Sequence, residues 1–234
     1  MSTSNVSTKL AMVSVFSREK LDLAQNFLES LRRFGIHKYH MSFVTDSITQ
    51  ETLVQSGFNV TLLDTPKIGD MPPINALRYG VVARLLGAFS HVWLLDIESV
   101  CHGNLTAFFH YDFPKDIDIV VQKKDSHTVN PGCMIVKSNP QTCALFAHMS
   151  ETKEDVDDAR VFTDIIPRVE PRLNLSFFDE SSFPNTSIYF GPSEKHDEYT
   201  MLNIKPLIVN ARFLDGIEQQ INALKATGNW ILDT

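Results

Sequence analysis

The chain has 234 residues, of which 43% are hydrophobic and 21% charged, with a formal net charge of −7. This length and composition allow one α/β domain with a real core and argue against general disorder. The basic side chains form no continuous stripe, which argues against a general nucleic-acid binder. An acidic protein can still bind an anionic ligand where a metal ion supplies positive charge locally.

The cysteines and the N-terminus narrow the expected class of protein further. Cys101, Cys133 and Cys143 are scattered and form no CxxC pair, which argues against a zinc site or a disulfide framework. The polar stretch from Met1 to Thr8 has no apolar signal segment, and no apolar run reaches the roughly 18 residues that a membrane span needs. We therefore expect a cytosolic protein without a membrane span.

Strand and helix patterns alternate through the first half of the chain. Short apolar runs predict strands at Leu10–Phe16, His40–Thr45 and Asn59–Leu63, and helical periodicity predicts helices over about Leu21–Gly35 and Gln50–Gln55. This β-α-β-α-β order is typical of a parallel sheet with crossover helices.

A proline-containing loop, Thr65–Pro73, then leads to a predicted helix at Ile74–Leu86 and a strand at His91–Leu95. Because the His91–Leu95 strand is apolar on both faces, we expect it at the centre of the sheet.

The second half of the chain predicts shorter elements. Strands are expected at Ile117–Val121, Cys133–Val136, Leu173–Phe178, Ser187–Phe190 and Leu207–Asn210. The segment Gln122–Pro131 is expected to be a loop, and helices are expected to begin at Asn139-Pro140, between Glu151 and Arg160, and near Gly216. The chain shows no repeat or flexible linker, so we expect a single domain over residues 1–234.

Two acids, Asp96 and Glu98, directly follow the predicted central strand. Ligands of open α/β sheets bind just beyond the carboxyl ends of the strands. Carboxylates two residues apart in a turn can share one hard cation, Mn²⁺ or Mg²⁺, which can bridge to a diphosphate. Burial of both acids without a counter-charge would be costly, which favours a metal. The alternative is a solvated loop with two surface acids.

Four segments occur in an order that is informative as a set. They are GAFSHVWLLDIE (87–98), NPGCMIVKSN (130–139), DDARVF (157–162) and IVNARFLDG (208–216). Together they resemble the motifs of the nucleotide-diphospho-sugar transferase family, a group of GT-A glycosyltransferases that includes small chlorovirus-encoded enzymes. The resemblance spans most of the chain, from Leu10 to Trp230.

The resemblance implies a GT-A fold, with a Rossmann-like, mostly parallel central sheet flanked by helices. It implies a metal-dependent glycosyltransferase that moves a sugar from a nucleoside diphosphate sugar, expected to be UDP-linked, to the hydroxyl of a glycan or another acceptor. Residues of about 10–100 would form the nucleotide-binding half and residues of about 101–234 the acceptor half. The resemblance also suggests a virus-encoded enzyme that acts in a host cytosol.

The resemblance also assigns the donor site. Asp96 and Glu98 would hold Mn²⁺ or Mg²⁺, with Asn210 in place of the family's metal-binding histidine, and Asp96 would also contact the ribose or diphosphate. The nucleotide contacts would be Ser17, Arg18, Asp46, Arg78, Asp96 and Arg212, with Arg212 in place of a missing phosphate-binding lysine.

Three of these assignments have structural alternatives. Asp158 would be the catalytic residue, as the general base of an inverting enzyme, or an ordinary acid at a helix start. Asp46 can equally be a helix N-cap. Arg78 can equally be a solvated helix cation.

Departures from the family pattern leave two other functions open. Ala159 replaces a glutamine that is usually aimed at the sugar, and Asn210 and Arg212 replace a histidine and an asparagine. These changes favour an inactive relative that binds a sugar or a protein partner. A nucleotidyltransferase is the nearest enzymatic alternative, but it would need a glycine-rich phosphate loop after the first strand, and residues 17–20 contain no glycine.

Overall fold

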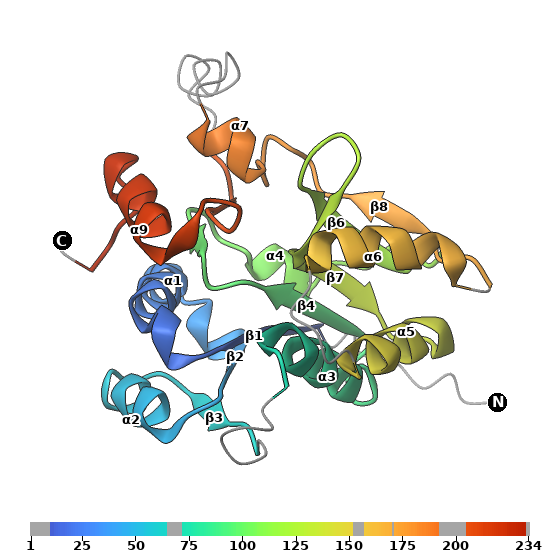
Figure 1. Ribbon diagram of the computed structural model, residues 1–234, viewed down its shortest axis with the longest axis horizontal. Helices are drawn as coiled ribbons and strands as arrows, with labels where there is room; N and C mark the ends of the chain where they lie inside the picture. Colours follow the sequence, from blue (N-terminus) through green and yellow to red (C-terminus); the bar gives the residue numbers. More distant parts are fainter. Residues whose placement is uncertain (1–9, 65–71, 152–156, 170, 192–204, 233–234) are drawn as a thin grey trace.

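A seven-stranded sheet forms the centre of the protein (Figure 1). The computed structural model describes residues 10–64, 72–151, 157–169, 171–191 and 205–232. The strand order is β3-β2-β1-β4-β7-β6-β8, and all neighbours are parallel except β7, which runs antiparallel to β4 and β6. A small antiparallel pair, β5-β9, forms a second sheet. The strands are β1 (Leu10–Phe16), β2 (His40–Val44), β3 (Val60–Leu62), β4 (His91–Leu95), β5 (Ser99–Cys101), β6 (Ile119–Lys123), β7 (Val129–Lys137), β8 (Leu175–Phe177) and β9 (Ile208–Asn210).

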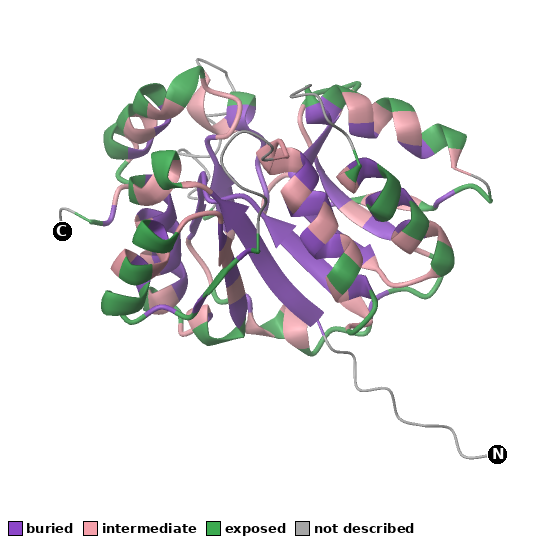
Figure 2. Cartoon of the chain, turned by 60° about the horizontal axis from the view of Figure 1, so that its bottom comes forward, coloured by how far each residue is buried: buried purple, intermediate pink, exposed green. Residues whose placement is uncertain are grey.

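Helices pack on both faces of the sheet with their exposed residues facing outward, which leaves the strands buried between them (Figure 2). The α-helices are α1 (Leu21–Arg33), α2 (Ser47–Gln55), α3 (Ile74–Leu86), α4 (Thr106–Phe109), α5 (Pro140–Ser150), α6 (Asp158–Ile165), α7 (Thr186–Phe190) and α9 (Gly216–Ala226). Short 3₁₀ turns are η1 (Arg18–Lys20), η2 (His37–Tyr39) and η3 (Ile166–Arg168). Within the described ranges, no helix is both long and apolar enough to cross a membrane. The architecture confirms the predicted mostly parallel α/β fold.

The side chains of β4 alternate between two hydrophobic cores. Trp93 is fully buried in the core that α1 covers, where Phe27 is also buried. Leu94 is fully buried in the opposite core, which Phe146 of α5 helps to fill. Successive side chains of a strand point to opposite faces, so a strand that is apolar at every position must be covered on both sides. The central position predicted for β4 is confirmed.

Two sequence predictions about the second half were wrong. The segment Ser187–Phe190 belongs to helix α7, because the Asn185 side chain caps its start by accepting a hydrogen bond from the Ile188 N–H at 2.9 Å. The segment Gln122–Pro131 is only partly a loop, since β6 continues to Lys123 through a bulge and β7 begins at Val129. A short apolar run does not distinguish strand from helix, and bulged pairing hides the alternation of a strand.

The start of α6 agrees with the sequence prediction, which placed it between Glu151 and Arg160. α6 starts at Asp158, and the Asp157 side chain caps it by accepting hydrogen bonds from the N–H groups of Ala159 and Arg160. Residues 152–156 and 65–71, on which parts of two expectations fall, lie outside the described residues. β5 and α4, three and four residues long, were not predicted.

His40 is a buried imidazole in β2, and it makes the stability of the fold depend on pH. Its Nε2 lies 3.0 Å from Ser14 Oγ and its Nδ1 lies 3.2 Å from Ser42 Oγ. Burial lowers the pKa of His40 from 6.5 to about 3. The unfolded chain therefore binds a proton below about pH 6.5 that the folded chain does not, and stability is lost as pH falls from there towards 3.

We expect the free energy of unfolding to drop by up to about 1.4 kcal/mol per pH unit from His40 alone over this window. His40→Gln should remove this contribution, since an amide does not titrate. Urea unfolding of both proteins between pH 7 and pH 4 measures the difference in slope. Equal slopes would show that folding does not lower the pKa of His40.

Candidate active site

A pocket of about 340 Å³ opens where β1 and β4 end side by side at the edge of the sheet. It takes its walls from the end of β1 and the η1 turn, the first turns of α3, the residues after β4, and the segment after β9. The lining residues are Val15, Phe16, Ser17, Glu19, Lys20, Ile74, Asn75, Arg78, Asp96, Ile97, Glu98 and Arg212. This is the edge where open α/β sheets bind their ligands.

The pocket holds a network of three cations and three carboxylates. Arg78 Nη1 lies 3.2 Å from Asp96 Oδ1, and Arg212 Nη1 pairs with Asp96 Oδ2. Lys20 Nζ pairs with Glu98 Oε1. The acids Asp96 and Glu98 are only 7% and 3% exposed, so each needs the counter-charge that it has.

Asp158, the third carboxylate, joins the two arginines from the start of α6. Arg212 Nη2 donates to both of its oxygens, at 2.7 Å and 2.6 Å, and Arg78 Nη2 lies 3.3 Å from Oδ2. The Tyr79 hydroxyl also donates to Oδ2, at 3.0 Å, and burial raises the pKa of this phenol, so it stays a donor. Asp158 thus accepts four hydrogen bonds, which places it as an anchor for both guanidinium groups.

Arg212 sits between two carboxylates. Burial, and next the positive charge of Arg78, lower the pKa of Arg212. A guanidinium starts so far above neutrality, and here faces Asp96 and Asp158, that it stays charged at pH 7. The formal charges of Lys20, Arg78 and Arg212 therefore balance those of Asp96, Glu98 and Asp158.

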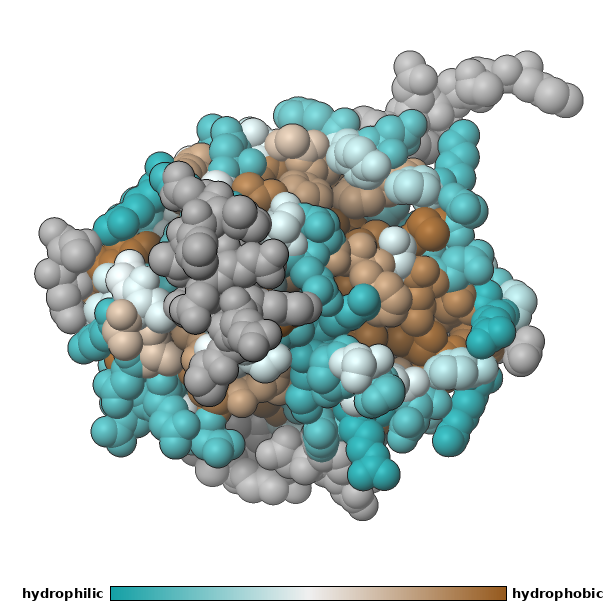
Figure 3. Space-filling model, turned by 90° about the horizontal axis from the view of Figure 1, so that it is seen from above, coloured by the Kyte–Doolittle hydropathy of each residue, from teal (hydrophilic) through white to brown (hydrophobic). Residues whose placement is uncertain are grey.

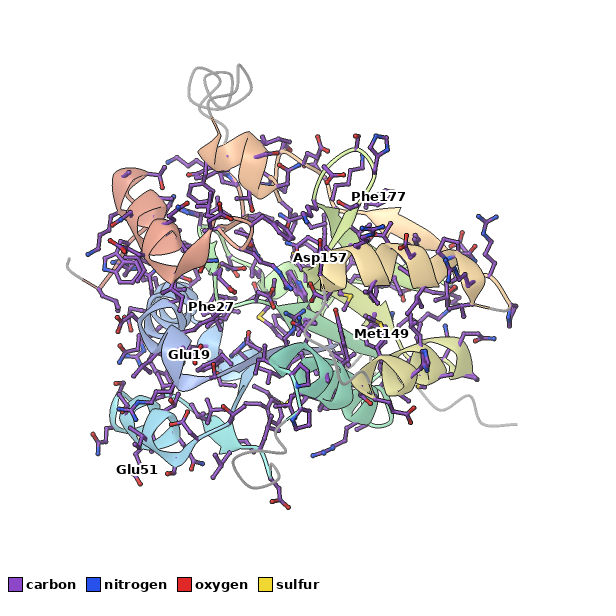
Figure 4. All side chains as sticks on the ribbon, in the orientation of Figure 1. Glu19, Phe27, Glu51, Met149, Asp157 and Phe177 are labelled. Atoms are coloured by element: carbon purple, nitrogen blue, oxygen red, sulfur yellow. The ribbon has the colours of Figure 1, made fainter. Side chains whose placement is uncertain are left out.

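The structure brings most, but not all, of the predicted site residues together. Ser17, Arg78, Asp96, Glu98 and Arg212 line the pocket, and Asp158 contacts it through both arginines. The neighbouring Asp157, labelled in Figure 4, caps α6 and is largely exposed to solvent.

Two predicted nucleotide contacts lie elsewhere. Asp46 caps α2 by accepting hydrogen bonds from the N–H and hydroxyl of Thr49, at 2.9 Å and 2.8 Å, as the structural alternative predicted. Arg18 is exposed and is not among the residues that line the pocket.

Sequence reasoning missed two members of the network, Lys20 and Tyr79. Lys20 lies in the turn after β1, where the predicted contacts were Ser17 and Arg18 instead. Tyr79 follows Arg78 on α3, and nothing in its sequence context separates it from an ordinary core aromatic. Their partners, Glu98 and Asp158, lie 78 and 79 residues away in the chain, so no local pattern could have paired them.

Gly132 of β7 explains how the network fits against the sheet. A Cβ atom on this residue would overlap the Asp96 carboxyl group and the Arg212 guanidinium. The Gly132 carbonyl also accepts a hydrogen bond from the Asp96 N–H at 2.7 Å. The glycine therefore lets β7 pass directly beneath the central ion pair.

The predicted metal ligands do not fit a divalent ion in this arrangement. Asp96 and Glu98 each face a side-chain cation rather than an open position. The Asn210 side chain is fully buried, with its oxygen accepting from the Arg212 N–H at 2.8 Å and its nitrogen donating to Ser99 Oγ at 3.0 Å. Within the described part of the chain, no group of three or more His, Cys, Asp or Glu side chains could hold a metal. Metal binding stays a prediction from the sequence.

A second pocket, of about 300 Å³, lies between the segment after α4 and β8 and shares no lining residue with the first. Its walls are mainly apolar, and the aromatic residues among them include Phe108, Phe113, Phe177 and Phe178. In the view from above, hydrophobic residues are exposed on the surface among hydrophilic ones (Figure 3). This pocket has no cluster of ionised groups, which leaves the charged pocket as the candidate active site.

Comparisons with known proteins point to one enzyme family. The sequence model of the nucleotide-diphospho-sugar transferases matches residues 73–224. No curated protein sequence matches the chain significantly.

Among solved structures, the fold resembles the apo form of the glycosyltransferase GlyE of Streptococcus pneumoniae TIGR4, with a TM-score of 0.58 at 15% identity over 87% of this chain and 54% of GlyE. This chain therefore spans about half of the GlyE chain.

Two further structures match over nearly their whole length. A glycosyltransferase involved in the glycosylation of the major capsid of PBCV-1 has a TM-score of 0.53 at 11% identity, covering 92% of this chain and 98% of that one. The galactosyltransferase LgtC, solved with donor and acceptor sugar analogs, has a TM-score of 0.54 at 10% identity, covering 94% and 96%. At these identities the likeness is one of fold.

Proposed function

The chain belongs to the nucleotide-diphospho-sugar transferase family, and from this premise we propose that it is a glycosyltransferase whose charged pocket binds the diphosphate of the sugar donor. The observation that carries the proposal is the convergence of Lys20, Arg78 and Arg212 on one pocket at the carboxyl ends of β1 and β4. Guanidinium groups suit phosphate oxygens because their N–H groups match them in pairs. The donor is a UDP-linked sugar, as the sequence resemblance implies.

We assign the nucleotide contacts to the residues that line this pocket. Arg78 and Arg212 face the phosphates, and Ser17 of the turn after β1 faces the nucleoside. Of the lining residues, all but Arg212 come from positions 15–98, which supports a nucleotide-binding half of about 10–100 and an acceptor half beyond it.

The proposed reaction is transfer of the glycosyl group to an acceptor hydroxyl. The bond between the anomeric carbon and the phosphate oxygen breaks, and its electron pair leaves with the nucleoside diphosphate. The acceptor oxygen forms the new bond to the anomeric carbon, and its proton passes to the departing diphosphate. Fixed guanidinium groups beside the leaving oxygen stabilise the charge that grows there, because they are already oriented and need no reorganisation.

A donor screen tests the proposal. The protein is incubated with UDP- and GDP-linked sugars and simple glycan acceptors, and free nucleoside diphosphate is measured with and without Mn²⁺. We expect release from a UDP-sugar that increases when an acceptor is present. Binding of nucleotide without any release across the panel would instead support a sugar- or protein-binding relative.

A further inference from the structure

The carboxylates expected to hold a metal are already neutralised by side chains of the protein. Both oxygens of Asp96 have a guanidinium partner, and Glu98 has the Lys20 ammonium. A divalent ion placed between these acids would meet carboxylates whose charge Lys20, Arg78 and Arg212 already balance. It would have to displace at least Arg212 and Lys20, and it would leave them without their partners in a site where unpaired charge is costly.

The same three cations can do for a diphosphate what a metal does. Arg78 and Arg212 line the pocket and carry ten N–H donors between them by their chemistry, of which the carboxylates take only part. Lys20 has three N–H donors and gives one to Glu98, and its side chain is 36% exposed, so it can reach a ligand without breaking its ion pair.

The acids have a role in this arrangement as well. Asp96 and Asp158 each form an ion pair with Arg212 and with Arg78. These pairs fix the planes of both guanidinium groups before a ligand binds. Groups that are held in place lose little conformational freedom on binding, so more of each contact appears as affinity.

We infer that this enzyme binds the diphosphate of its donor through Lys20, Arg78 and Arg212 and needs no divalent metal to do so. The inference rests on the proposed function, because it concerns the same pocket and the same donor. It opposes the metal role predicted for Asp96 and Glu98. If a metal holds the diphosphate, a chelator should abolish nucleotide binding; if the three cations hold it, a chelator should leave binding unchanged.

Calorimetry of UDP and GDP binding in EDTA and in Mn²⁺ distinguishes binding through the three cations from binding through a metal. We expect the affinity of the wild-type protein for its nucleotide to agree in the two buffers within about threefold, well below the worth of one charged hydrogen bond. Lys20→Ala should weaken binding in EDTA by about tenfold or more, as the loss of such a bond implies. Because this variant leaves the buried Glu98 without its cation, a thermal melt must show that it still folds before its affinity is compared.

Two further variants complete the test. Arg212→Lys keeps the charge but loses the paired donors, and it should also weaken binding about tenfold. Arg84→Ala, which removes an exposed cation from the last turn of α3, is the matched control and should bind like the wild type. Binding that appears only with Mn²⁺ would overturn the inference and leave the proposed function standing. No binding of either nucleotide in either buffer would overturn both.

Discussion

Asp158→Asn is expected to lower turnover by about 100-fold or more. In the wild type, both oxygens of Asp158 accept hydrogen bonds from Arg212, and Oδ2 also accepts from Arg78 and Tyr79. Asparagine turns one of these acceptors into a donor that would face a guanidinium, so the two arginines lose the position from which they meet the leaving group. Steady-state kinetics with the best donor from the screen measures the loss.

The pH dependence of this variant tells a positioning residue from a general base. A general base must take a proton, so its loss removes the acid limb of the pH–rate profile. We expect the limb to persist, because the oxygens of Asp158 are already occupied by three neighbouring side chains. Disappearance of the limb would support the general-base role predicted from the sequence.

Asp157→Asn is the matched control for Asp158→Asn. The two acids are adjacent, but Asp157 caps α6 and points to solvent, and asparagine caps helices about as well as aspartate. Turnover and thermal stability should both stay near the wild-type values. A comparable loss in both variants would mean that the start of α6 matters as a whole, rather than the network.

Gly132→Ala is expected to reduce turnover by about 100-fold, because small displacements of catalytic groups have effects of this size. The added methyl group would overlap the Asp96 carboxyl and the Arg212 guanidinium, which must then move apart. The backbone of Gly132 is not in the left-handed region, so any loss comes from this overlap and not from backbone strain. The overlap should also destabilise the fold by about 1–3 kcal/mol, the usual cost of overpacking.

Gly80→Ala provides the comparison. A Cβ on this residue of α3 would meet only Ser150 Cβ, at an ordinary 3.5 Å, and it lies outside the charged pocket. In a helix interior alanine is favoured over glycine by roughly 0.5–1 kcal/mol, so this variant should melt slightly higher with unchanged turnover. Thermal melts and initial rates of Gly132→Ala and Gly80→Ala measure the two effects. Wild-type turnover in Gly132→Ala would show that Asp96 and Arg212 need not hold their positions.

The order of strands and helices in the first half followed from the sequence alone, because local patterns carry that information. The alternation of apolar strands and periodic helices in the first half predicted a mostly parallel sheet, and the apolar run from Val92 to Leu95 predicted the central place of β4. Asp96 and Glu98 were predicted at the functional edge for the same reason, since they directly follow that strand. Where the pattern was short, as in Ser187–Phe190, the sequence could not distinguish strand from helix, and a cap by Asn185 decided.

The partners of the acids were decided only by the tertiary structure. Arg212 reaches Asp96 across 116 residues and Asp158 across 54, and Lys20 reaches Glu98 across 78. The order of the motifs indicated an enzyme family, but it did not predict which acidic and basic side chains would form ion pairs. Ion pairing depends on the packing of β7, α6 and the segment after β9 around the end of β4, and that packing is set by burial throughout the domain rather than by any local run of residues.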